Sequence, residues 1–206
     1  MPTALSSTMT IHLTADLHLG HERILELSNR PFATVEEMND TLIANYNARV
    51  NRGDLVFIVG DFAWRDHAKY LSALKGRKIL IVGDHDRMSQ IAMRQFQDVH
   101  QKLETKIQGQ YVTLCHHPLV SWAKSFHGSW HFHGHSHGRL EEPSHKLCCD
   151  IGVDVWDYAP IPWEVLRKRM TDKIPAWQAY HDSFDGDPNA NVQALRAKNQ
   201  LYLRNP

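Results

Sequence analysis

Five short motifs, four of them directly after an apolar run, constrain the fold of this 206-residue chain most strongly. The runs at residues 11–15, 55–59, 79–82 and 111–115 have the length and composition of buried β-strands. Because open sheets collect ligands at the carboxyl ends of their strands, the motif side chains are expected to converge on one metal site. The motifs are Asp16-Leu17-His18, Gly60-Asp61, Gly83-Asp84-His85-Asp86, His116-His117-Pro118 and Gly134-His135-Ser136-His137.

Helices are predicted between the strands of the first half. Thr34 and Glu37 have the spacing of a capping box, and apolar residues then recur at three- and four-residue steps, which predicts a helix over residues 35–49. A shorter amphipathic pattern over residues 66–74 ends before Gly76. The alternation of strand and helix favours an α/β fold with right-handed crossovers.

The second half is expected to form a second, more antiparallel sheet, with strands at residues 99–106, 111–115, 129–133 and 146–150. Pro162 opens a helical segment over residues 163–170. We therefore predict a domain over residues 1–170 and a C-terminal extension over residues 171–206, with a helix at 190–203. Trp177, Tyr180 and Phe184 favour an extension that packs on or near the domain, but a solvated tail stays open as the alternative.

The composition restricts the class of protein. A chain of this length can bury a core without metal or disulfide staples, and its 23 basic and 23 acidic side chains give no overall field for capturing nucleic acid, although a local basic groove stays open. Three cysteines without a spaced framework favour a reducing compartment. The first ten residues lack the pattern of a leader, and no apolar run reaches about 18 residues. We expect a soluble cytoplasmic protein.

The order, spacing and letters of the five motifs resemble the calcineurin-like metallophosphoesterase superfamily. The resemblance spans residues 11–137 and continues more weakly to residues 152–156. It implies an α/β fold of two β-sheets packed face to face and flanked by α-helices, a four-layer αββα sandwich.

The resemblance also implies a role for each motif residue. Asp61 would bridge two divalent ions, and His85 would protonate the leaving oxygen while Asp86 orients its ring. A mixture of imidazole and carboxylate suits Mn, Fe, Zn or Ni better than Mg or Ca, and Mn is the first expectation. The ligands implied are Asp16, His18 and His137 for the first ion, and Asp84, His116 and His135 for the second.

Some positions leave alternatives open. Either His116 or His117 can face the metal, and the motif order favours His116. Asp84 stands where the superfamily usually has asparagine, and this change is compatible with natural tuning, loss of activity or an introduced mutation. His131 and His133 are interpreted as packing or supporting residues. The spacing does not choose a phosphate contact among three basic residues, which are Arg23, Arg87 and Lys124.

The function implied is a two-metal phosphoesterase that hydrolyses phosphomonoesters or phosphodiesters, with metal-bound hydroxide as the nucleophile. A nucleotide, a cyclic nucleotide or a nucleic-acid end would serve as substrate, and no membrane partner is expected. One rival is a catalytically weak or inactive scaffold that binds a protein partner through the same face; such a chain usually loses ligands. A second rival, a metal-storage protein, would carry tandem histidine clusters.

Overall fold

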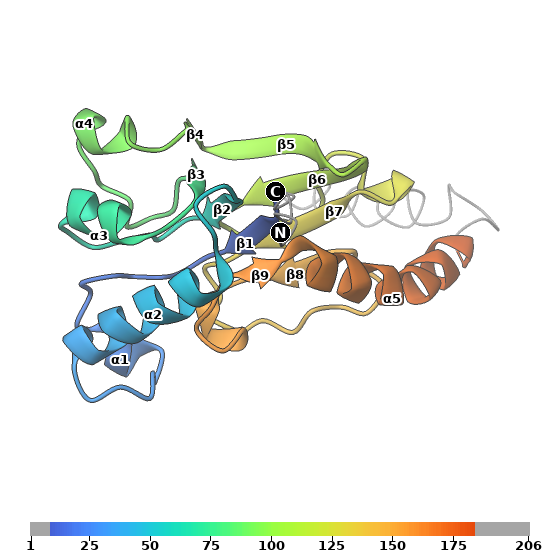
Figure 1. Ribbon diagram of the computed structural model, residues 1–206. Helices are drawn as coiled ribbons and strands as arrows, with labels where there is room; N and C mark the ends of the chain where they lie inside the picture. The colour runs from blue at the N-terminus through green and yellow to red at the C-terminus, as the bar shows by residue number, and fades with distance from the viewer. Residues whose placement is uncertain (1–8, 184–206) are drawn as a thin grey trace, which may run out of the picture.

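Two β-sheets form the body of the protein, and the computed structural model describes residues 9–183. Figure 1 shows the sheets beside one another, with the helices around them. The first sheet has the order β4-β3-β2-β1-β9, and its strands are β1 (Ile11–Thr14), β2 (Leu55–Val59), β3 (Arg77–Ile81), β4 (Asp98–His100) and β9 (Ile161–Pro162). The second sheet has the order β5-β6-β7-β8, and its strands are β5 (Lys102–Ile107), β6 (Gln110–Cys115), β7 (Trp130–His133) and β8 (Cys148–Asp150).

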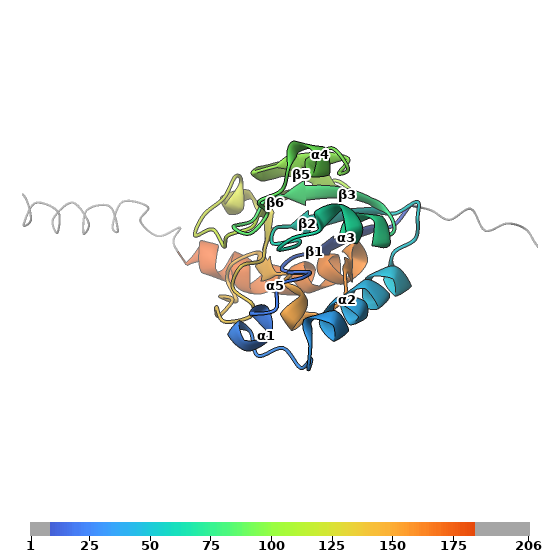
Figure 2. The same ribbon diagram turned by 90° about the vertical axis from the view of Figure 1, so that its left-hand side faces the viewer.

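The strands β1 to β4 run parallel, which explains their continuous apolar runs: both faces of the sheet are covered. One face packs against α2 (Val35–Arg49) and α3 (His67–Ala73), and Figure 2 shows this arrangement from the end of the sheets. Thr34 is confirmed as the N-cap, since its Oγ1 accepts the N–H of Glu37 at 3.1 Å; the Glu37 carboxylate accepts the N–H of Ala33, one residue before the cap, at 2.8 Å. Two four-residue helices, α1 (Ile24–Leu27) and α4 (Gln90–Met93), complete this side.

The other face of the first sheet and one face of the second share a single core. Leu13 and Phe57 meet Leu114 and Phe132 there. The helix α5 (Trp163–Asp182) adds a buried stripe to the same core, formed by Trp163, Leu166 and Met170. The expectation of an α/β fold with two face-to-face sheets flanked by helices is therefore confirmed.

The pairing within the second sheet differs from the prediction. Only β5 and β6 are antiparallel, whereas β6, β7 and β8 are parallel. The strand predicted over residues 99–106 is divided, because the chain leaves the first sheet after β4 and enters the second at β5. Alternating side chains mark an extended segment but not its partner strand. The parallel pairing has a consequence for the site, since it brings the carboxyl ends of β6 and β7 to the same edge.

The helix α5 continues through Pro175, although the sequence predicted helix only to residue 170. The predicted boundary between domain and extension thus falls inside one helix, and Trp177 packs against the inter-sheet core. The predicted helix over residues 190–203 and Phe184 lie outside the described residues. Two single turns of 3₁₀ helix, η1 (Ser125–His127) and η2 (Val153–Val155), lie in the connecting loops. Among the helices of residues 9–183, none has the length and apolar character to cross a membrane.

Candidate metal centre

The five motifs meet at one edge of the two sheets because backbone pairing continues past the strand ends. Beyond β1 and β2, the N–H of Asp16 bonds to the carbonyl of Gly60 at 3.1 Å, and the N–H of His18 bonds to the carbonyl of Asp61 at 2.8 Å. Beyond β6 and β7, the N–H of Gly134 bonds to the carbonyl of His116 at 3.0 Å. The expected convergence of side chains from distant parts of the chain is thereby confirmed.

The backbone is strained at the positions of the expected ligands. Five of them have φ values between 48° and 67°, in the left-handed region that costs an L-residue about 1–2 kcal/mol. Such conformations persist where surrounding structure enforces them, and they gather at functional sites. The five residues are Asp16, His18, Asp61, His135 and His137.

Two motif glycines allow the loops to approach this closely. A Cβ atom on Gly60 would overlap the imidazole Nδ1 of His116, and one on Gly83 would overlap the Asp61 carboxylate. Gly60 and Gly83 are therefore required because a side chain from another motif fills the space that their Cβ atoms would take, and not only because of the turns in which they lie.

The side chains form two adjoining groups with a shared carboxylate between them. Asp61 Oδ2 lies 3.3 Å from His18 Nε2 on one side and 3.4 Å from His116 Nε2 on the other. On the first side, donor atoms of Asp16, His18 and His137 lie within 4.8 Å of one another; on the second, those of Asp84, His116 and His135 do so. Asp61 thus occupies the position expected of a bridging ligand.

Two orphaned nitrogen atoms test whether these residues fit metal ions. The Nε2 atoms of His18 and His116 are buried and have no hydrogen-bond partner among the described residues. A buried polar atom without a partner costs free energy, and imidazole nitrogens next to a carboxylate oxygen form a donor set that divalent metals bind. Burial lowers the pKa of His18 well below its usual value, so this imidazole is in the neutral form that binds metal. The residues fit divalent ions.

Two buried groups of the site have strongly shifted pKa values. Asp16 is fully buried, and its desolvation raises the pKa of the carboxyl group to about 7. Burial acts to lower the pKa of His116, but the Asp61 carboxylate 3.4 Å from its Nε2, with the charge of Asp16, raises it to about 9. Burial thus favours the protonated form of Asp16, and the neighbouring carboxylates favour the protonated form of His116. A divalent ion is the stronger counter-charge and would displace those protons.

Arg30 and Asp154 support the first group, and the sequence analysis missed both. His137 Nδ1 donates to Asp154 Oδ2 at 2.7 Å, and Arg30 donates to both carboxylate oxygens of Asp154 at 2.8 and 2.9 Å. Arg30 also donates to the carbonyl of Asp16 at 2.6 Å. This chain of bonds fixes the ring of His137 with Nε2 free to bind a metal. The weak resemblance over residues 152–156 was a signal for Asp154; Arg30 had none.

Replacing Asp154 by alanine is expected to weaken binding at the first metal position by roughly 10- to 100-fold, because it releases the ring of His137 and leaves Arg30 without its carboxylate. Asp154→Asn is the matched control: an amide oxygen still accepts from Nδ1, so the loss should be smaller. Titration of each variant with Mn²⁺ by calorimetry measures the effect. Equal affinity in Asp154→Ala and the parent protein would show that the contact does not orient the ligand.

Asp86 has a different role from the one that the resemblance implies. Its two carboxylate oxygens accept the backbone N–H groups of Asp61 at 2.9 Å, Phe62 at 2.8 Å and Gly83 at 2.8 Å. Residues adjacent in a turn point in different directions, and Asp86 points into the protein with 4% of its surface exposed. We therefore correct the expectation that Asp86 orients the ring of His85: it holds the loops after β2 and β3 together.

His85 lies at the open side of the shared carboxylate. Its backbone N–H donates to Asp61 Oδ1 at 2.9 Å, its ring Nε2 lies 4.0 Å from Asp61 Oδ2, and its side chain is 38% exposed. On the protein side, its imidazole neighbours the rings of His18 and His21, whose centroids lie 5.3 and 5.5 Å from its own. The imidazole can therefore reach a molecule bound in front of Asp61.

The paired histidines after β6 occupy different depths. His116 is buried, and its Nδ1 donates to the carbonyl of Val59 at 3.0 Å, which leaves Nε2 for the site. The His117 side chain is half exposed, and its Nε2 lies 3.1 Å from Asp84 Oδ2 at the rim. His135 Nδ1 approaches the same Asp84 oxygen at 3.3 Å. The second group is thus more open to solvent than the first.

Other residues named from the sequence lie outside the groups. His131 is bonded at both ring nitrogens, to the carbonyl of Thr113 and the N–H of Leu119, as expected for a packing residue. His133 is buried and bonds to the carbonyl of Gly134. Lys124 covers the ring of Tyr111 at 3.6 Å, at the far end of β6 from the motif. Arg23 and Arg87 are exposed on the loops near the site.

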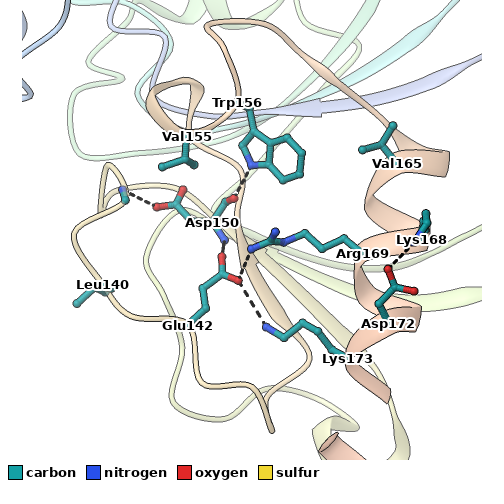
Figure 3. A pocket seen from close by; sticks show the side chains of 11 residues that line it. Leu140, Glu142, Asp150, Val155, Trp156, Val165, Lys168, Arg169, Asp172 and Lys173 are labelled. Carbon is teal, nitrogen blue, oxygen red and sulfur yellow. Dashed lines mark hydrogen bonds and ion pairs between the residues drawn. The ribbon is translucent and has the colours of Figure 1, made fainter. Parts of the chain in front are cut away.

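A large pocket lies beside the metal centre, between the loop that follows His137 and α5 (Figure 3). Its volume is about 840 Å³, and its charged side chains other than Asp150 are paired with one another. Glu142 contacts Arg169 at 2.9 Å and Lys173 at 3.5 Å, and Lys168 contacts Asp172 at 2.6 Å. The two Glu142 pairs connect the loop to α5, whereas the Lys168–Asp172 pair lies within the helix.

Comparisons with known proteins identify relatives in sequence and in structure. No protein-family model matches the chain. The uncharacterized protein MJ1445 of Methanocaldococcus jannaschii is 33% identical over 173 residues, covering 79% of this chain and 92% of that protein. Among solved structures, the protein of unknown function AQ665 from Aquifex aeolicus is 21% identical with a TM-score of 0.61, covering 78% and 99% of the two chains. The phosphoesterase YfcE from E. coli is 16% identical with a TM-score of 0.36, covering 70% and 78%.

The level of identity to MJ1445 over nearly the whole of that protein establishes a common family, and the likeness to AQ665 shows a shared fold. The five motifs stand in the superfamily order and assemble one site on two face-to-face sheets. The chain therefore belongs to the family of MJ1445.

Proposed function

We propose that the protein is a two-metal phosphoesterase that hydrolyses phosphomonoesters or phosphodiesters. The observation that carries the proposal is the pair of buried, unpartnered imidazole nitrogens of His18 and His116, which face one carboxylate oxygen of Asp61 from opposite groups. Carboxylate and imidazole ligands in this mixture suit Mn, Fe, Zn or Ni, and we propose Mn first. The described cysteines are free thiols, which suits the cytoplasm as the compartment.

Each residue of the site has a task in this proposal. Asp16, His18 and His137 hold one ion, Asp84, His116 and His135 hold the other, and Asp61 bridges them. When bound, the two ions would activate a water molecule and offset the charge of the phosphoryl group. His85, on the exposed side of Asp61, donates a proton to the leaving oxygen. Asp86 keeps the loops of Asp61 and His85 in register.

The two metal positions are expected to differ in affinity. In the first, Asp16 and His18 are buried and His137 is held by Asp154; in the second, the side chains of Asp84 and His135 are 48% and 45% exposed. Side chains that are buried and held in place lose less conformational entropy on binding an ion than exposed ones do, and water competes less with them for the ion. Elemental analysis after dialysis against Mn²⁺ should give two ions per chain, and a brief exposure to chelator should remove one first. A ratio near zero would contradict the metalloenzyme proposal.

Activity is tested with a panel of phosphate esters, assayed separately with Mn, Ni, Zn and Mg. Hydrolysis that depends on added metal is the expected result, with Mg the weakest activator because it prefers oxygen ligands and retains its water. Metal binding without hydrolysis of any ester would point instead to the catalytically inactive scaffold.

Asp84→Asn is expected to raise kcat/KM when metal is saturating. The carboxylate of Asp84 adds negative charge to a site that receives phosphate, and it lacks the N–H donor of an amide. Recovery of about 1–3 kcal/mol of charged hydrogen bonding corresponds to roughly one to two decades. With metal limiting, the gain should narrow or reverse, because the carboxylate retains its ion more tightly. A variant that is no better than the parent at any metal concentration would identify Asp84 as a tuned native ligand.

A further inference from the structure

An exposed tryptophan lies beside the proposed acid of the reaction. The ring of Trp64 lies 5.3 Å from that of His85, centroid to centroid, and 49% of Trp64 is exposed. Its neighbour on the protein side is His21, which stacks against it at 4.4 Å with an interplanar angle of 10°. Half of a large apolar side chain thus faces solvent at the edge of a polar site, where its burial would otherwise be favourable.

The position of Trp64 is fixed by the same backbone pairing that positions the metal ligands. The N–H of Trp64 bonds to the carbonyl of Leu19 at 2.9 Å, and Leu19 pairs with Ala63 beyond the ends of β1 and β2. His67 Nε2 also bonds to the carbonyl of Ala63, at 3.0 Å. Trp64 therefore follows Asp61 by three residues on a loop that is held at both ends.

His21, which stacks against the ring of Trp64, is also held in place. His21 is 7% exposed, its N–H bonds to the carbonyl of His18 at 3.0 Å, and its Nδ1 lies 3.3 Å from His18 Nδ1. The stack of Trp64 on His21 is thereby tied to a metal ligand. A platform that is ordered before the ligand arrives loses little entropy when a flat ring binds to it.

The position of the Trp64–His21 stack next to His85 indicates which part of the substrate it would contact. A general acid must lie next to the oxygen that leaves, so the group attached to that oxygen extends past His85. Trp64 is the half-exposed aromatic ring next to His85 on that side. A ribose would span the gap between the leaving oxygen and a nucleobase stacked on Trp64, whereas a ring attached directly to the oxygen would lie nearer His85.

We propose that Trp64 binds the leaving group of the substrate by stacking, and that the substrates are phosphate esters of nucleosides. This inference rests on the proposed phosphoesterase function. Stacking of a base on an aromatic side chain tolerates any base, so the platform selects nucleosides as a class rather than one nucleobase. His21 is a positioning residue, since it touches Trp64 and His18.

The test compares binding of AMP and ribose 5-phosphate to the Mn²⁺-loaded protein by calorimetry. The two probes share sugar and phosphate and differ in the base. We expect AMP to bind roughly tenfold more tightly or better. Trp64→Ala should abolish this difference, whereas Trp64→Phe, which keeps an aromatic face, should retain most of it. Metal content and melting temperature of each variant show that the fold and the metal centre are intact.

Each outcome decides one of the two proposals. Equal binding of AMP and ribose 5-phosphate, or a preference for AMP that survives Trp64→Ala, overturns the role of Trp64 even where the protein hydrolyses esters. A Trp64-dependent preference for AMP in a protein that hydrolyses no ester supports the platform and overturns the phosphoesterase. Phenyl phosphate is the third probe: an equal Trp64-dependent gain for phenyl phosphate overturns the assignment to nucleosides.

Discussion

Replacing Asp61 by alanine is expected to release metal from both positions at once and to reduce ester hydrolysis to the rate without added metal. Asp61 Oδ2 is the carboxylate oxygen that lies within 3.4 Å of the unpartnered nitrogens of both His18 and His116. Without it, each position loses a ligand and the two ions lose the negative charge between them. Elemental analysis of metal per chain and an assay with a nitrophenyl ester measure the two effects.

Asp54→Ala is the matched control for this experiment. Asp54 is also a buried aspartate next to β2, but it precedes the strand instead of following it. Its carboxylate accepts the N–H groups of Thr10 at 2.9 Å and Asn51 at 2.8 Å. Loss of these bonds should lower the stability by about 1–3 kcal/mol while two ions per chain remain.

The comparison of the two variants separates loss of a ligand from general damage. If Asp61→Ala keeps one ion with unchanged affinity, the two positions are independent and Asp61 belongs to a single group. If Asp54→Ala also loses its metal, the loss follows from destabilisation and the bridging role is unsupported. Thermal unfolding without metal gives the stability of each variant on its own.

The elements and candidate ligands predicted from the sequence are those whose signals are local. Buried parallel strands leave continuous apolar runs, so β1, β2 and β3 could be placed, and the motif residues followed from the strand ends. The helix α2 begins at Val35, directly after the N-cap residue Thr34 that the sequence predicted. The seven proposed ligands converge because the register of neighbouring strands carries them to one edge.

The features that the sequence did not reveal depend on contacts between distant segments. Arg30 bonds to Asp154, which is 124 residues away in the sequence, and it lies in a turn whose sequence has no periodic pattern to predict the contact. Asp86 was assigned to its sequence neighbour, whereas its oxygens bind the loop of Asp61. Packing between distant segments likewise decides which strand pairs with β4 and how far α5 continues beyond Pro175. The local sequence pattern carries no information about that packing.

Replacing His85 by alanine is expected to lower turnover by roughly 10²–10⁴-fold while two metal ions remain bound. The side chain is the exposed part of this residue, and its backbone N–H, which bonds to Asp61 Oδ1 at 2.9 Å, is kept in the alanine variant. The loop and the shared carboxylate should therefore stay in place. As the proposed general acid, the imidazole would give a proton to the leaving oxygen, which alanine cannot do.

The dependence on the leaving group distinguishes proton donation from any other role of the imidazole. A nitrophenolate leaves without protonation, so its ester should lose far less activity in His85→Ala than an alkyl ester does. His117→Ala is the control, since this ring is also exposed and near the site but contacts Asp84; its effect should not vary with the leaving group. Equal losses for both esters in His85→Ala would remove the residue from the proton-donating role.

Asp86→Asn completes the assignment of this loop. Asp86 accepts three backbone N–H groups and an amide can replace only part of that, so the variant should lower the melting temperature and slow nitrophenyl and alkyl esters by the same factor. If Asp86 oriented the ring of His85 instead, its replacement would reproduce the selective loss for alkyl esters. The ratio of the two ester rates in Asp86→Asn therefore decides whether the carboxylate acts on the imidazole or on the loops, and the three bonds to the backbone favour the loops.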